Sequence, residues 1–121
     1  IGQDYLPEID IFEAVGIEYG HVYYVNHWKE AEEIKRAFEG IEHTNPLDFH
    51  TYSIEWTQDE IKWFVDGKHI FTSTEGIPNE PMYLIINLAI GGEWPGSPNE
   101  DTKFPMNFVI KDLKVMKEVT K

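Results

Sequence analysis

The sequence has no cysteine and few basic residues. Without cysteine there are no disulfides and no thiolate metal site, so the sequence does not distinguish an oxidising from a reducing compartment. Its 121 residues carry 22 acidic against 10 basic side chains, and the formal charge of -12 would repel nucleic acids and anionic membranes. We therefore expect no nucleic-acid or membrane partner. A neutral substrate fits this charge better.

Long apolar runs are also missing. No stretch is long enough to span a bilayer, and no basic, apolar, small-residue leader opens the chain. The chain begins at Ile1 without Met and almost inside a strand, which we interpret as a processed product or a fragment. Its length allows about one domain with a single core.

β-Branched and aromatic residues, which favour strands, are concentrated in short segments. Turn-forming residues at Thr57–Glu60 and Val65–Lys68 join adjacent segments, and the Gly- and Pro-rich stretch Gly91–Pro105 cannot continue a sheet. The sequence predicts one all-β unit with strands over Val22–Trp28, Phe49–Trp56, Ile61–Asp66, His69–Ser73, Met82–Ile90 and Phe108–Met116. Four aromatic strand residues are expected to pack in the core rather than bind sugar: Tyr52, Trp56, Trp63 and Phe64.

The segment Lys29–Gly40 is the exception to the strand pattern. Strong helix formers precede a stopping glycine, and Ile34 and Phe38 are four residues apart, so the isolated string favours a helix. The alternative is an edge strand over Ile34–Gly40 with charged residues on its outer face. In either structure we interpret the charges as solvated.

Three carboxylates interrupt the first apolar segment. In a regular strand Glu8 and Asp10 share a face, whereas Glu13 would point to the apolar side, where an unpaired charge costs several kcal/mol. A one-residue β-bulge at Ile11 and Phe12 would restore the phase and place all three acids on one face. The sequence therefore predicts a bulge and an acidic surface.

The spacing of these acids suits sugar chemistry. With the bulge, Glu8 and Glu13 are about four strand steps apart, roughly 13 Å between backbones at about 3.3 Å per residue. Side chains that lean inward would bring the carboxyl groups to about 5 to 6 Å, near the separation that a retaining glycosidase uses. Asp10 between them would help to keep an acid protonated near neutral pH.

The motif "EIDIFE" resembles the bulged, laminarinase-like E-[I/L]-D-x-x-E signature of glycoside hydrolase family 16. The resemblance continues through "DFHTYSIEWTQDEIKWFVDGK" and "MYLIINLAIGGEWPGSPNEDTKFP" to "FVIKDLKVM", and leaves Lys29–Pro46 loose. It implies a jelly-roll, concanavalin A-like β-sandwich, secreted or extracellular, that cleaves internal β-1,3 or mixed β-1,3/1,4 bonds of glucan with retention. Galactan cleavers also belong to the family. Glu8 is implied as the nucleophile, Asp10 as the assisting carboxylate and Glu13 as the general acid/base.

The resemblance also implies further site residues. His27, beside the catalytic strand, would bond a substrate hydroxyl or Glu13, or be a half-buried histidine without that role. Asn87 is expected to face the substrate groove, with local pairing as the alternative. Trp94, in the Gly-Pro loop, would stack on a sugar ring or pack under its loop. Asp112 lies where many members hold a structural calcium, although a solvated Asp is the alternative, and hydrolysis requires no cofactor.

Domains of the family are considerably longer than this chain. Residues 1–121 would be a partial catalytic domain truncated at its N-terminal side, with half a groove and unpaired strand edges that favour self-association. We therefore expect a homodimer or a larger assembly. The alternative to a β-glucanase is a weak or inactive sandwich that binds carbohydrate or self-assembles.

Overall fold

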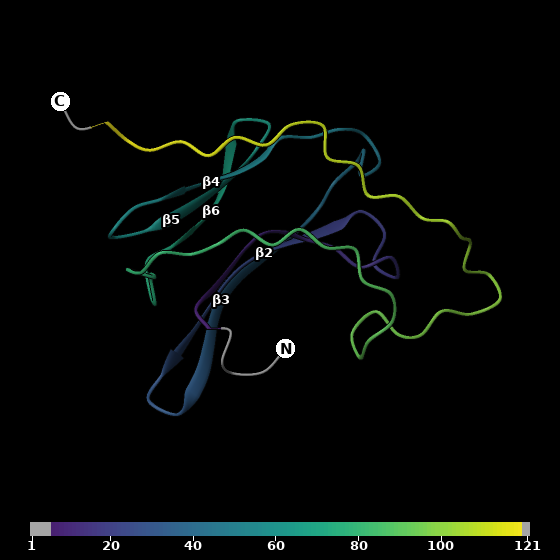
Figure 1. Cartoon of the computed structure of the whole chain (residues 1–121), viewed down its shortest axis with the longest axis horizontal. Helices are drawn as coiled ribbons and strands as arrows, with labels where there is room; N and C mark the ends of the chain where they lie inside the picture. The colour runs from purple at the N-terminus through teal and green to yellow at the C-terminus, as the bar shows by residue number, and fades with distance from the viewer. Residues whose placement is uncertain (1–5, 120–121) are drawn as a thin grey trace. The chain divides into compact units, whose positions relative to one another are not determined.

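The computed structural model describes residues 6–119 and contains six β-strands in two three-stranded antiparallel sheets (Figure 1). One sheet has the strand order β1-β2-β3 and the other has β4-β5-β6. Residues 6–119 contain no helix, so the all-β prediction is confirmed. The strands are β1 (Glu8–Glu13), β2 (His21–Glu30), β3 (Glu33–Glu42), β4 (Tyr52–Trp56), β5 (Ile61–Val65) and β6 (Lys68–Ser73).

The β2–β3 hairpin corrects the helix predicted over Lys29–Gly40. The two strands pair along their whole length without a register shift, and Ala31 turns the chain with a φ of 55°. Cross-strand pairing satisfies the backbone groups of β3 that face β2 and outweighs its local helix propensity. Because β3 forms one edge of its sheet, the edge-strand alternative is confirmed.

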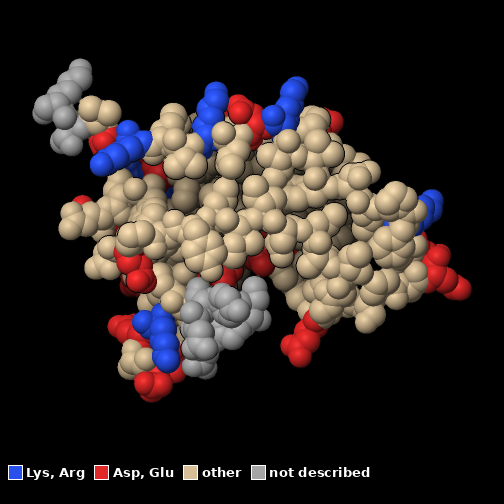
Figure 2. Space-filling view, viewed as in Figure 1, with Lys and Arg blue, Asp and Glu red and all other residues tan. Residues whose placement is uncertain are grey.

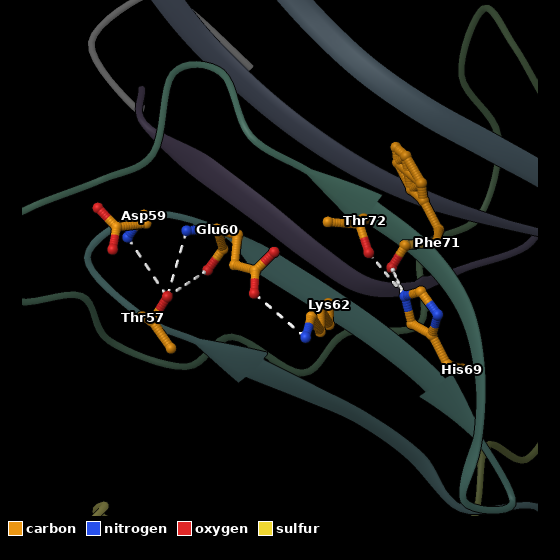
Figure 3. Close-up of polar contacts among 7 residues, drawn as sticks. All are labelled: Thr57, Asp59, Glu60, Lys62, His69, Phe71 and Thr72. Atoms are coloured by element: carbon orange, nitrogen blue, oxygen red, sulfur yellow. Dashed lines mark hydrogen bonds and ion pairs between the residues drawn. The ribbon is translucent and has the colours of Figure 1, made fainter.

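Turn residues read from the sequence form the hairpins of the second sheet. Asp66 and Gly67, between β5 and β6, have φ values of 51° and 80°, as a type I′ turn requires. Between β4 and β5, the Thr57 hydroxyl accepts hydrogen bonds from the backbone N–H groups of Asp59 at 3.3 Å and Glu60 at 3.2 Å (Figure 3). One side chain thus satisfies two backbone donors of the turn.

The two sheets pack face to face through a small core. Alternation along β2 and β5 turns Val22 and Tyr24 of one sheet toward Ile61, Trp63 and Val65 of the other, and all five are buried. This contact joins the strand pair that carries the acids to the middle strand of the second sheet.

The prediction of core aromatics is correct for two of the four residues. Trp63 is fully buried, and Tyr52 packs against the core. Trp56 is instead partly exposed and donates its Nε1–H to the carbonyl of Pro78 at 3.0 Å. Phe64 has the opposite parity to Trp63 on β5, so its ring lies on the other face of the sheet and is only half-buried.

The chain divides into two compact units, residues 1–83 and 84–121, and all six strands belong to the first. In the described part of the second unit, residues 84–119, no strand forms (Figure 1). The strands predicted over Met82–Ile90 and Phe108–Met116 are therefore wrong. A strand needs a neighbour to complete its hydrogen-bond ladder, and neither segment pairs in a ladder within residues 6–119. The predicted loop Gly91–Pro105 is confirmed.

In Figure 2, basic and acidic side chains lie near one another at several places around the rim, and the basic ones do not gather into one patch. Several basic groups are paired, including Lys35 with Glu30 at 2.5 Å and Lys62 with Glu60 at 3.2 Å. Within residues 6–119 there is no helix with the length and apolar character that crossing a membrane requires.

Candidate active site

β1 carries a bulge where the spacing of the acids predicts one. Asp10 pairs with Val25 and Glu13 pairs with Tyr23, so three steps along β1 match two steps along β2. The extra residue restores the phase of the side chains that follow it. Glu13 therefore lies on the face that carries Glu8 and Asp10, and the predicted shared face is confirmed.

A buried tryptophan from the second sheet holds this bulge. The Nε1–H of Trp63 donates a hydrogen bond of 2.9 Å to the backbone carbonyl of Asp10, directly before the register shift. Because a bulge disrupts the local ladder, the indole provides the carbonyl with a donor from the other sheet. Sequence reasoning placed Trp63 in the core but missed this contact, since alternation with Ile61 and Val65 indicates burial and nothing more.

His27 contacts the middle acid of the three. It lies opposite Glu8 on β2, and its Nε2 is 3.0 Å from Oδ2 of Asp10. The sequence predicted a bond to Glu13 or to a substrate hydroxyl, whereas the structure places the ring on Asp10. The hydrogen bond to Asp10 raises the pKa of His27, and burial of the ring opposes this shift.

Both glutamates have raised pKa values. Burial, followed by the hydrogen bond and the charge of Asp10, raises the pKa of Glu8 to about 7. Burial and the charge of Asp10 also raise the pKa of Glu13, while the positive charges of His27 and Arg36 oppose that shift. A carboxyl group with a raised pKa can hold a proton near neutral pH, as a general acid must.

Two groups bear on metal binding. Glu8, Asp10 and His27 offer ligand atoms within 4.8 Å of one another, and they are the set within residues 6–119 that could hold an ion. At the predicted calcium position, the exposed Asp112 pairs with Lys114 at 3.5 Å. Calcium takes about 6–8 oxygen ligands, and in the described chain Asp112 belongs to no group of three acidic or histidine side chains, so the calcium site stays a prediction.

The other two predicted substrate contacts lie in the second unit. Asn87 is exposed, and so is part of the Trp94 ring. The hydrogen bonds and charges around Glu8, Asp10, Glu13 and His27 all come from the first unit, so the groove positions of Asn87 and Trp94 stay predictions.

Comparisons with known proteins identify relatives over most of the chain. Residues 2–108 match the family model described as Glycosyl hydrolases family 16. The chain is 34% identical over 131 residues to Glucan endo-1,3-beta-glucosidase A1 of Niallia circulans and 33% identical over 141 residues to a Beta-glucanase of Rhodothermus marinus. These matches cover 92% and 98% of this chain but 19% and 48% of the two relatives.

A solved structure gives the same result for the fold. The laminarinase catalytic domain of Thermotoga maritima is 32% identical, with a TM-score of 0.66 over 79% of this chain and 44% of that domain. The predicted jelly-roll β-sandwich is confirmed by this likeness. The chain spans less than half the length of each of these relatives.

Proposed function

Because the chain belongs to glycosyl hydrolase family 16, we propose that it carries the active site of a retaining endo-β-glucanase acting on β-1,3 or mixed β-1,3/1,4-glucan. The observation that carries this proposal is the bulged strand β1, whose three acids lie on one face with raised pKa values for Glu8 and Glu13. Relatives named as β-glucanases support a polysaccharide substrate.

The proposed mechanism is double displacement. Glu13 protonates the glycosidic oxygen while Glu8 attacks the anomeric carbon, and the leaving sugar departs. Glu13 then removes a proton from the water that attacks the glycosyl-enzyme, which frees Glu8 and restores the proton on Glu13. Asp10 assists by favouring protonation of Glu13, the proton donor, and His27 balances part of the charge of Asp10. No cofactor takes part.

The charge of the chain supports the same class of partner. A formal charge of -12 and three clustered carboxylates would repel nucleic acid and anionic lipid, whereas a neutral glucan carries no such penalty. Since such glucans are polymers met outside the cell, the proposal includes an extracellular site of action.

The first experiment measures release of reducing ends from laminarin, lichenan and agarose. The proposal expects hydrolysis of one or both glucans and none of agarose. Hydrolysis of agarose alone would assign the site to galactan, while release from none of the three would contradict an active glucanase.

The second experiment assigns the two roles. Glu8→Ala and Glu13→Ala should each reduce the rate by several orders of magnitude, because each removes a group that reacts with the sugar. Azide should rescue Glu8→Ala to the α-glycosyl azide, since it takes the place of the nucleophile. With an activated leaving group, azide should rescue Glu13→Ala to the β-azide. The same anomer from both variants would contradict the assignment.

The second candidate function is carbohydrate binding or self-assembly without cleavage. It is favoured by one observation, the absence of strands from residues 84–119, which leaves the second unit without a sheet. Titration with laminarihexaose separates the two candidates, because a binding module would retain the oligosaccharide and release no reducing ends.

A further inference from the structure

The register of the first sheet extends the acidic face onto β3. Glu8 pairs with His27, and His27 pairs in turn with Arg36. Directly opposed residues of neighbouring antiparallel strands point to the same face of the sheet. Arg36 therefore lies on the face of the carboxylates, in the row of the proposed nucleophile.

The next row of the sheet runs from an acid to an aromatic ring. Asp10 pairs with Val25, and Val25 pairs with Phe38, so the three side chains share this face. Two strand spacings separate the backbones of Asp10 and Phe38, about 10 Å. Val25 between them is 5% exposed, whereas Phe38 is 53% exposed. In this row a buried valine thus lies between a carboxylate and an exposed phenyl ring.

Arg36 and Phe38 act on each other and on the site. The guanidinium carbon of Arg36 lies 5.4 Å from the centroid of the Phe38 ring, a cation–π distance. The positive charge of Arg36 also opposes the rise in the pKa of Glu13, so Arg36 and Glu13 interact electrostatically. The guanidinium lies over the Phe38 ring on a strand position that shares the carboxylate face, with several N–H donors to offer.

Edge-strand solubility does not account for this pair. A charged edge strand protects a sheet from aggregation, and Lys35 and Glu39 on the opposite face of β3 suit that purpose. An exposed phenyl ring on the carboxylate face works against it. An apolar ring beside hydrogen-bond donors suits a ligand with an apolar face and polar edges, as a pyranose ring has.

We propose that Arg36 and Phe38 form a sugar-binding subsite on β3 for a neutral pyranose unit of the polysaccharide. The Phe38 ring packs against the C–H face of the sugar, and Arg36 donates hydrogen bonds to its hydroxyl groups. An anionic sugar is disfavoured because Glu8, Asp10 and Glu13 share the face. The choice of a β-glucan rests on the proposed function, but the position of the subsite does not.

The test measures binding of laminarihexaose by calorimetry, in the Glu8→Gln background so that nothing is cleaved. Phe38→Ala should weaken the affinity about 3- to 10-fold, as expected for loss of one aromatic contact, and Phe38→Tyr should restore it. Arg36→Gln should weaken it as well.

Ile34→Ala is the matched control. Ile34 lies on the same strand and face as Phe38 and is also 53% exposed, but it pairs with Lys29 near the hairpin end, outside the rows of the acids. The affinity of the Ile34→Ala variant for laminarihexaose should be unchanged. Equal losses in Phe38→Ala and Ile34→Ala, an unchanged affinity in Phe38→Ala, or no binding by the Glu8→Gln chain would each overturn the subsite.

Failure of the subsite and failure of the proposed function have different signatures. If the chain binds laminarihexaose through Phe38 but releases no reducing ends, the subsite stands and the glucanase fails. If it hydrolyses laminarin and Phe38→Ala leaves KM unchanged, the glucanase stands and the subsite fails. With both correct, Phe38→Ala raises KM more than it lowers kcat.

Discussion

Asp10 acts on every titratable neighbour that the candidate site contains. Its charge raises the pKa of Glu8 and of Glu13, and its hydrogen bond raises the pKa of His27. Asp10→Asn keeps the shape of the side chain but removes the charge, so the pKa of Glu8 should fall from about 7 toward its ordinary value of 4.5. The pKa values of Glu13 and His27 should fall in the same variant. Carboxyl-carbon and imidazole NMR titrations measure all three.

The same substitution should move the pH dependence of hydrolysis. The reaction needs one glutamate ionised and the other protonated, so kcat/KM should follow a bell with both limbs above pH 4.5, and Asp10→Asn should shift both limbs to lower pH. Asp59→Asn makes an equal change of charge in the β4–β5 turn and should leave the profile in place. A Glu8 pKa that stays near 7 in Asp10→Asn would mean that burial alone raises it.

The alternation of side chains along a strand explains which site residues could be predicted from the sequence. Glu13 is out of phase with Glu8 and Asp10 in an apolar strand, and a bulge was the structure that relieved the conflict, as found. The contact of Trp63 with Asp10 was not predictable in this way, because it depends on how two sheets pack. The position of Arg36 required the register of an edge strand that the sequence assigned to a helix.

At the scale of elements, strands were predictable where a neighbouring segment completes the ladder. The Asp66–Gly67 turn set the register of β5 and β6 locally, and both strands form as expected. Lys29–Gly40 has the composition of a helix, but its pairing with β2 decides its structure. Two further segments have strand composition but pair in no ladder within the described chain, Met82–Ile90 and Phe108–Met116. Composition alone was therefore not sufficient to predict a strand.

The bulge of β1 depends on a contact between the two sheets, which gives a prediction for that element. Trp63→Phe keeps an aromatic ring in the core but removes the donor to the carbonyl of Asp10, and should lower the free energy of unfolding by about 1–3 kcal/mol. Backbone amides of Ile11, Phe12 and Glu13 should then exchange faster with solvent. Urea unfolding and hydrogen-exchange NMR provide the measurements.

Trp56→Phe is the control for this prediction. It also removes an indole hydrogen bond to a backbone carbonyl, that of Pro78, but at a partly exposed side chain away from the bulge. It should destabilise the chain less and leave the exchange of the β1 amides unchanged. Equal destabilisation by both substitutions, with no change in β1 exchange, would show that the bulge holds without Trp63.

At the scale of the whole molecule, exposed apolar side chains favour self-association and the net charge opposes it. Within residues 6–119 each sheet has three strands, so two strands in each lie at an edge and can offer unpaired backbone groups. The second unit adds exposed large apolar side chains, which include Ile85, Ile86, Leu88, Ile90, Phe104, Val109, Leu113 and Val115. The charge of -12 repels copies of the chain from one another, but salt screens that repulsion.

We therefore expect the chain to self-associate as a homodimer or a larger assembly, and more strongly as salt is added, because burial of apolar surface then meets less repulsion. Light scattering coupled to gel filtration at low and high salt measures the mass. Ile86→Lys with Ile110→Lys should shift the equilibrium toward the monomer, since a buried lysine charge is unfavourable. Ile17→Lys, at an exposed turn residue of the first unit, should not. A monodisperse monomer at micromolar concentration in both salts would show that these apolar segments are satisfied within one chain.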